Sequence, residues 1–376
     1  MDGRGKKLLA ALAVAMTLVL VAGVLASMDA INLPGEWREK LGLAETGAPD
    51  NPCRVGLYRH SPASPPPPPG RWRFEAEMPR AQVEGSAVAI GPVIYTFGGS
   101  APGNLHRVLA FDTRTGRWSE PTRLPTGLNH SQAVAYRGDA YLAGGYLEGA
   151  EATSNFWKYD PRANRWTAMP PMGKPRGAAA AAVVGGKLYV ADGAPQTYGV
   201  SNPDGPYDSL ESFDFAANAW SAEPPAPVRV HHVSATSLGG KLYMAGGRVD
   251  PEASSDEFLS YDPVTERWRR LPKLPTGKYS SLGVVSAGGK VVVYGGDDEL
   301  NWEEGGGSTN ASAWAFDPGS ERWQRLPDLT IERHAFGAAV AGDRVYAIGG
   351  APCPGIKPNG PVPTYTVESL PVSALR

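Results

Sequence analysis

Histidine is the chain's most chemically suggestive residue, because four of its six copies occupy one position in a recurring pattern. His130, His231, His232 and His334 each stand about fifteen residues before a pair of adjacent glycines. An imidazole changes charge near neutral pH, so it serves as a general acid or base, a proton shuttle or a metal ligand. Their shared position predicts that these four side chains gather in one place.

Other polar residues share that position or directly follow a glycine pair. If each pair ends the second strand of an antiparallel sheet, the start of the first strand lies beside it. Convergent polar groups on a concave surface indicate a ligand site, although strand starts beside a wet channel are also simply polar. The candidates are Glu84, Asn129, His130, Tyr146, Arg176, His231, His232, Arg248, Tyr279, Asp297, Arg333 and His334.

A long acidic loop after the glycine pair of the fifth repeat adds two further candidates, Asp298 and Trp302. Long loops in compact folds are often functional. Trp302 is suited to stacking on a sugar ring, while the neighbouring carboxylates accept hydrogen bonds from the sugar hydroxyls. It is equally suited to folding down as a lid. The acids suit Ca²⁺ as oxygen ligands, but their spacing matches no calcium loop, which favours a solvated acidic loop.

The elements that position these residues are repeats. Each repeat contains Gly-Gly, or Asp-Gly in one worn copy, then a variable loop, an aromatic-Asp pair and a Trp, with a constant distance from Asp to Trp. A period of about 46–55 residues is typical of propeller blades. The five copies are Gly98-Gly99 to Trp118, Gly144-Gly145 to Trp166, Asp192-Gly193 to Trp220, Gly246-Gly247 to Trp268, and Gly295-Gly296 to Trp323.

These features resemble the Kelch repeat, within the superfamily that includes the central domain of galactose oxidase, over about residues 71–370. The resemblance implies an all-β, six-bladed Kelch-type β-propeller with four antiparallel strands per blade, and ligand binding at the channel mouth. A sixth glycine pair, Gly349-Gly350, has no Trp after it, whereas Trp72 precedes the first repeat. We therefore expect residues 71–78 to supply the strand that closes the sixth blade, leaving 371–376 as a tail.

The N-terminus has the form of an export segment. Basic residues precede an uncharged apolar run within residues 1–28, which fits either a cleaved signal peptide or an uncleaved membrane-anchoring helix. Residues 29–70 predict a tether, with five consecutive prolines that favour a stiff polyproline II spacer over a ligand for another domain. We expect an extracytoplasmic protein, secreted or anchored, in which Cys53 and Cys353 form a disulfide.

No cofactor or metal is expected. A site of three histidines from alternate blades is conceivable, but a six-bladed channel is expected to be too wide for the rings to meet. The copper oxidases of the galactose-oxidase superfamily need a Cys linked beside a Tyr, and neither cysteine here has a neighbouring Tyr. A net charge of −2 argues against a nucleic-acid partner.

Three functions follow from these features. The first is an extracytoplasmic binding or scaffold module that recognises a glycan or a protein at the channel mouth. The alternative is an enzyme resembling the sialic acid mutarotases, with Arg248 pairing a sugar carboxylate and His231, Glu84 or Asp297 moving protons. An intracellular adaptor, the third interpretation, conflicts with the export segment. The absence of a catalytic motif favours binding over catalysis.

Overall fold

The computed structural model describes residues 67–100, 105–148, 151–196, 205–249, 253–298, 308–352 and 363–376. The predicted N-terminal helix, nearly all of the tether, Cys53, Trp302 and Cys353 lie outside these ranges. Within the ranges, no helix is long and apolar enough to cross a membrane.

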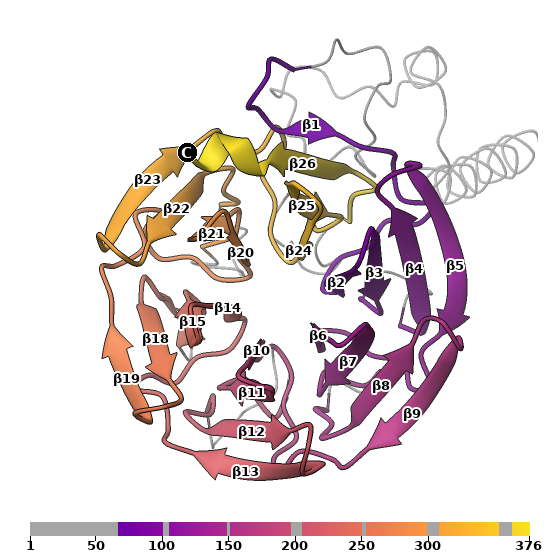
Figure 1. Ribbon diagram of the computed structural model, residues 1–376, viewed down its shortest axis with the longest axis vertical. Coiled ribbons are helices and arrows are strands. Elements are labelled where there is room, and N and C mark those ends of the chain that lie inside the picture. The colour runs from indigo at the N-terminus through magenta and orange to yellow at the C-terminus, as the bar shows by residue number, and fades with distance from the viewer. Residues whose placement is uncertain are drawn as a thin grey trace, which may run out of the picture. The chain divides into compact units, whose positions relative to one another are not determined.

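Six four-stranded antiparallel sheets form a ring of blades around a central channel, as the repeats predict (Figure 1). Each blade runs from an inner strand at the channel to an outer strand at the rim. Blades 1 to 3 are β2 (Ser86–Ile90), β3 (Val93–Phe97), β4 (Arg107–Asp112) and β5 (Arg117–Arg123); β6 (Gln132–Tyr136), β7 (Asp139–Ala143), β8 (Phe156–Asp160) and β9 (Arg165–Met169); and β10 (Ala180–Val184), β11 (Lys187–Ala191), β12 (Leu210–Asp214) and β13 (Ala219–Glu223).

Blades 4 to 6 repeat the arrangement, with a short hairpin in blade 4 and a 3₁₀ helix at the C-terminus. They are β14 (Ser234–Leu238), β15 (Lys241–Ala245), β18 (Phe258–Asp262) and β19 (Arg267–Arg270), with the hairpin β16 (Arg248–Val249) and β17 (Ala253–Ser254); β20 (Gly283–Ala287), β21 (Lys290–Tyr294), β22 (Ala313–Asp317) and β23 (Arg322–Leu326); and β24 (Gly337–Ala341), β25 (Arg344–Ile348), β26 (Val367–Pro371) and β1 (Arg73–Phe74), followed by η3 (Val372–Leu375).

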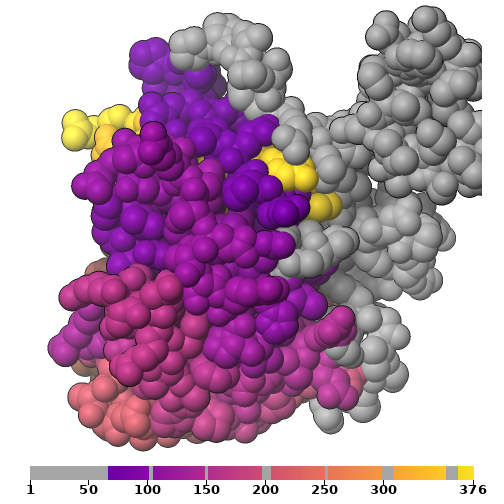
Figure 2. Space-filling view, turned by 90° about the vertical axis from the view of Figure 1, so that its right-hand side faces the viewer, coloured from indigo at the N-terminus to yellow at the C-terminus, as the bar shows by residue number. Residues whose placement is uncertain are grey.

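The sixth blade joins the two ends of the described chain, which confirms the predicted closure. Strand β1 pairs antiparallel with β26, with Arg73 opposite Ser369 and Phe74 opposite Glu368. Figure 2 shows the first described residues (indigo) against the last (yellow). Because β1 covers the edge of β26, no gap is left in the sixth blade where another chain could pair with that strand.

The repeated tryptophans pack between blades, as predicted. In five blades the indole Nε1 donates a hydrogen bond to a carbonyl of the preceding blade's outer strand or the residues flanking it. Trp220, for example, donates to Pro170 O at 2.8 Å. Blade 2 differs, because the Asn164 amide takes the equivalent carbonyl of Pro121. Aromatic contacts also cross between blades, as between Phe156 and Phe213, whose ring centroids lie 4.9 Å apart. Each blade therefore depends on its neighbour.

The glycine pairs bring each blade into backbone contact with the next. The amide of the second glycine donates to a carbonyl of the next blade, at 3.1 Å from Gly247 N to Tyr279 O. The first glycine has positive φ, and a Cβ added at Gly246 would lie only 2.3 Å from Tyr279 O. Asp192 replaces this glycine in blade 3 at φ 58°. It is fully buried, and burial raises the pKa of its carboxyl well above its usual range.

We expect the substitution Gly246→Ala to lower the free energy of unfolding by more than about 2 kcal/mol, since it combines left-handed strain with a steric clash. The matched control is Gly239→Ala in the same blade, where φ is +58° but nothing lies within 4 Å of the added Cβ. That variant incurs only the strain of the left-handed backbone, which lowers the free energy of unfolding by about 1–2 kcal/mol. Urea unfolding of both variants measures the difference, and equal losses would contradict the close inter-blade approach.

Candidate binding site at the channel mouth

The channel mouth is the end of the central channel at which the six inner strands begin. Two residues before each inner strand, one residue takes the left-handed conformation, with φ between 51° and 58°. The amides of five of these residues donate to the same position of the preceding blade, as from His130 N to Glu84 O at 2.8 Å and from Ser281 N to His232 O at 2.9 Å. We call these positions the mouth ring: Glu84, His130, Ala178, His232, Ser281 and Ala335.

The mouth ring and the first residues of the inner strands line a cavity of about 140 Å³. One part of its wall is polar, because Glu84, His130, His232 and Ser281 line it together with Gln132. Further along, alanine dominates the inner strands and the channel continues toward the opposite face. A concave surface with polar groups at one end is suited to binding a ligand or a partner's side chain.

A second layer of predicted residues lies directly outside the mouth ring. The sequence predicts that the residue before the inner strand pairs with the residue after the glycine pair, and the structure shows this pairing in antiparallel bridges. They join Asn129 to Tyr146, Gly177 to Ala194, His231 to Arg248, Ser280 to Asp297, and His334 to Ala351.

Histidines from two of the three alternate blades meet, although the channel was expected to be too wide for three rings to do so. His130 Nε2 lies 3.0 Å from His232 Nε2, although the two residues belong to blades 2 and 4. His232 Nδ1 is also hydrogen-bonded to His231 Nδ1. The rings meet because blade 3 has only Ala178 at the position between them. Even so, within the described ranges no group of three or more His, Cys, Asp or Glu residues has the geometry of a metal site.

Burial dominates the electrostatics of the histidines. It lowers the pKa of His231 to about 4 and that of His232 well below its usual value. Burial likewise lowers the pKa of His130, against the opposing effect of the Glu84 carboxylate 3.6 Å away. It also lowers the pKa of His334. All four rings are therefore neutral at physiological pH.

Arg248 is held inside the protein by neighbours from blade 5. Its Nη2 lies 2.6 Å from Asp297 Oδ2, and its Nε donates to Ser280 Oγ at 2.7 Å. Ser280 Oγ in turn donates to Asp297 Oδ1. The Arg248 and Asp297 side chains are only 5% and 0% exposed. This arrangement ties blade 4 to blade 5, and a sugar carboxylate would have to displace Asp297 to pair with Arg248.

Stability should therefore depend on pH. A histidine with a lowered folded pKa stabilises the protein fully above the unfolded pKa of about 6.5, and this contribution is lost as the pH falls toward the folded pKa. For His231, whose folded pKa is about 4, the loss by pH 5 is about 2 kcal/mol. Urea unfolding from pH 7.5 to 5 measures it. His231→Gln should make the profile shallower without flattening it, because His130, His232 and His334 also have lowered folded pKa values. A flat wild-type profile would contradict neutral burial.

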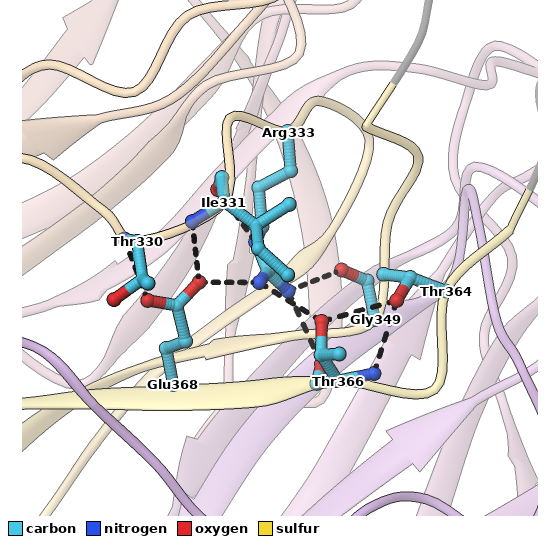
Figure 3. A network of polar contacts seen from close by, with 7 residues as sticks. All are labelled: Thr330, Ile331, Arg333, Gly349, Thr364, Thr366 and Glu368. Carbon is cyan, nitrogen blue, oxygen red and sulfur yellow. Dashed lines mark hydrogen bonds and ion pairs between the residues drawn. The ribbon is translucent and has the colours of Figure 1, made fainter. Parts of the chain in front are cut away.

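Two predicted candidates, Arg176 and Arg333, lie within blades rather than at the cavity. Arg333 is fully buried and pairs with the equally buried Glu368 of β26 (Figure 3). Its Nη1 donates to Gly349 O at 2.8 Å and to Thr366 O at 3.1 Å. Arg176 pairs in the same way with Glu211 of β12. These guanidinium groups pin the connection before the inner strand to the third strand of the same blade.

The remaining candidates also lie away from the cavity or outside the described residues. Tyr279 packs beside the apolar cluster between blades 4 and 5. The Asp298 carboxylate accepts hydrogen bonds from the amide and hydroxyl of Ser308. Trp302 is outside the described ranges. Sequence reasoning missed Gln132 as a contributor to the site, and the signal for it is its fixed offset from the glycine pair.

The repeats, the ring and the glycine contacts define a Kelch-repeat β-propeller. A family model, the Attractin/LZTR1 beta-propeller, matches residues 94–352, and the chain belongs to this family. It is 30% identical over 260 residues to mouse Kelch-like protein 35, covering 69% of this chain and 42% of that protein. It is 25% identical to Kelch-like protein terF of Aspergillus terreus, over 75% of this chain and 65% of the relative.

A solved structure, titled "Structure of YjhT", shares the fold. Its TM-score is 0.65 at 17% identity, and the match covers 78% of this chain and 96% of that one. At that identity the likeness shows the architecture alone. The chain spans about two fifths of the length of the Kelch-like relatives from mouse, Xenopus tropicalis and Danio rerio, at 42%, 37% and 37%.

Proposed function

We propose that this chain is a protein-binding module outside the cytoplasm that recognises its partner at the channel mouth. The observation that carries the proposal is the convergence of polar side chains from blades 1, 2, 4 and 5 on one cavity. The Kelch-like relatives support a binding role, and their names state no enzymatic activity. The described residues that directly follow the glycine pairs, such as Tyr146 and Arg248, pair with residues at this mouth.

The test places a photo-crosslinking amino acid at one position per face of the full-length chain. Ser100 is exposed beside the mouth, where its amide bonds to Val83 O. Val264 is 90% exposed in the turn between β18 and β19, on the opposite face. We expect a specific crosslinked protein from Ser100 only. Equal crosslinking from both positions would contradict the proposal.

A charge reversal in the mouth ring tests the same surface. Glu84→Lys keeps a long side chain but inverts the charge beside His130, so crosslinking from Ser100 should fall at least tenfold. Val264→Lys is the matched control and should leave it unchanged. If deglycosylation of the partner also abolishes crosslinking, the recognised group is its glycan, the other ligand class that this cavity suits.

The extracytoplasmic location rests on residues 1–28 and has its own test. We expect the propeller to be accessible to protease added to intact cells, and Cys53 and Cys353 to be oxidised to a disulfide. Thiol titration of the unfolded, unreduced protein should then find no reactive thiol. Titration after reduction should find two. Two reactive thiols without reductant would contradict the disulfide, and protection from protease would contradict the location.

A further inference from the structure

The contact between His130 and His232 joins two blades that are not neighbours. It crosses blade 3 at the mouth ring, where the described residue of that blade is Ala178, whose side chain is a single methyl group. Just outside, a Cβ added at Gly177 would lie 2.6 Å from the Tyr146 ring, so Tyr146 fills the space above blade 3. The Tyr146 ring also packs edge-on against His130, with centroids 5.3 Å apart. Small residues in blade 3 thus make room for a cross-channel bridge.

The bridge requires one hydrogen at each nitrogen–nitrogen contact. Asn129 Oδ1 accepts from His130 Nδ1 at 2.7 Å, so His130 Nε2 carries a lone pair. That lone pair accepts the hydrogen on His232 Nε2, and His232 Nδ1 accepts the hydrogen on His231 Nδ1. If the Asn129 amide were flipped, donor and acceptor would exchange roles in each contact, but each contact would still contain one hydrogen. A proton from solvent added to His130 Nε2 would place two N–H groups face to face.

We propose that the His130–His232 bridge is a pH-operated latch on the channel mouth, closed while both imidazoles are neutral and opened when His130 Nε2 takes up a proton. The inference rests on the proposed function in so far as the mouth is the binding surface, and it then makes partner binding pH-dependent. The opening step transfers one proton from hydronium to His130 Nε2, which leaves a water molecule, and it breaks the hydrogen bond between His130 and His232. No other covalent bond changes.

The groups around the latch decide where it acts. Glu84 from blade 1 favours the imidazolium form of His130, whereas Arg248 from blade 4 and His334 from blade 6 oppose it. His231 and His334 oppose a charge on His232. Arg248 is itself largely neutralised by Asp297 from blade 5. Burial outweighs Glu84, so the latch stays closed at neutral pH and opens in the acidic range below the usual imidazole pKa of about 6.5.

Hydrogen exchange of the full-length chain tests the latch without a partner. The amides of Ala178 and Ser281 bond to the carbonyls of His130 and His232, at 3.0 and 2.9 Å, and therefore report directly on the two latch residues. After correction for the intrinsic rate, we expect their protection to fall at least tenfold between pH 7.5 and pH 5. The Asn218 amide, in a turn on the opposite face, should keep its protection.

The matched variant is the double substitution His130→Gln with His232→Gln, which replaces the bridge by two amides that do not titrate. Its mouth amides should change less than threefold over the same range, while His106→Gln should behave like wild type. Unchanged protection in wild type, or an equal drop in the double variant, would overturn the latch. A third result would also overturn it: a tenfold rise in the protection of the mouth amides when Zn²⁺ is added at pH 7.5 to wild type but not to the double variant. Such a rise would make the histidine pair a metal site.

The exchange result and the crosslinking result are independent. Exchange is measured on the protein alone, so a failure there removes the latch and leaves binding at the mouth intact. Loss of specific crosslinking from Ser100 removes binding at the mouth and leaves the latch as a property of the fold.

Discussion

Replacing Arg333 with glutamine should lower the free energy of unfolding by about 3–5 kcal/mol, because it leaves the Glu368 carboxylate as a buried charge without its counter-ion. Both side chains are completely buried. Glu368 also accepts the amides of Thr330 and Ile331, at 2.7 and 3.2 Å (Figure 3). The loss therefore spreads to the connection that leads into the inner strand of blade 6. Urea unfolding of the variant measures it.

Two controls separate the buried charge from the lost contacts. The double variant Arg333→Gln with Glu368→Gln contains no buried charge, so it should recover part of the lost stability. Arg325→Gln breaks an ion pair with Asp328 in which both side chains are about half exposed. Such exposed pairs contribute less than about 1 kcal/mol. If Arg333→Gln costs no more than Arg325→Gln, the pair is not the pin described above.

The second large effect is expected at the closure of the ring. Trp72 is 2% exposed and packs against Tyr294, with ring centroids 5.3 Å apart. Its Nε1 donates to Pro327 O at 2.9 Å. Trp72→Ala should cost about 3–5 kcal/mol in unfolding free energy, because it empties a site between blades 5 and 6. Trp72→Phe keeps most of the packing and loses only the hydrogen bond, about 1 kcal/mol.

Deleting residues 71–78 goes further, since it removes β1 and leaves the edge of β26 unpaired. We expect the deletion variant to elute as aggregates in size-exclusion chromatography. In calorimetry it should not unfold in a single cooperative transition. A soluble deletion variant that unfolds in one transition would show that the ring does not need its N-terminal strand.

The sequence predicts the architecture well because the Kelch features are local and repeated. Each glycine pair marks the end of a second strand, and the constant distance from Asp to Trp spans a single turn. Even the closure follows from counting, since Trp72 lacks a glycine pair before it and Gly349-Gly350 lacks a Trp after it. The bridges from His231 to Arg248 and from Asn129 to Tyr146 also follow, because antiparallel pairing fixes the register.

The site is less predictable because its contacts join distant residues. The spacing places Arg333 at the mouth, but its partner Glu368 stands 35 residues away on another strand and draws the guanidinium into the blade. His130 and His232 are separated by 102 residues, and their contact depends on Ala178 being small. A search for polar residues does not single out Ala178, the small residue that allows the His130–His232 contact.

Closure by the N-terminal strand also has a mechanical consequence. Any pull from the preceding chain enters the propeller at β1, which is held to β26 by two residue pairs. The Trp72 indole and the bond from Ser369 Oγ to Glu75 Oε1 add to this resistance. Tension along the preceding chain would therefore load the seam of the ring before any other blade. The strand that completes the propeller is thus also the element through which force would open it.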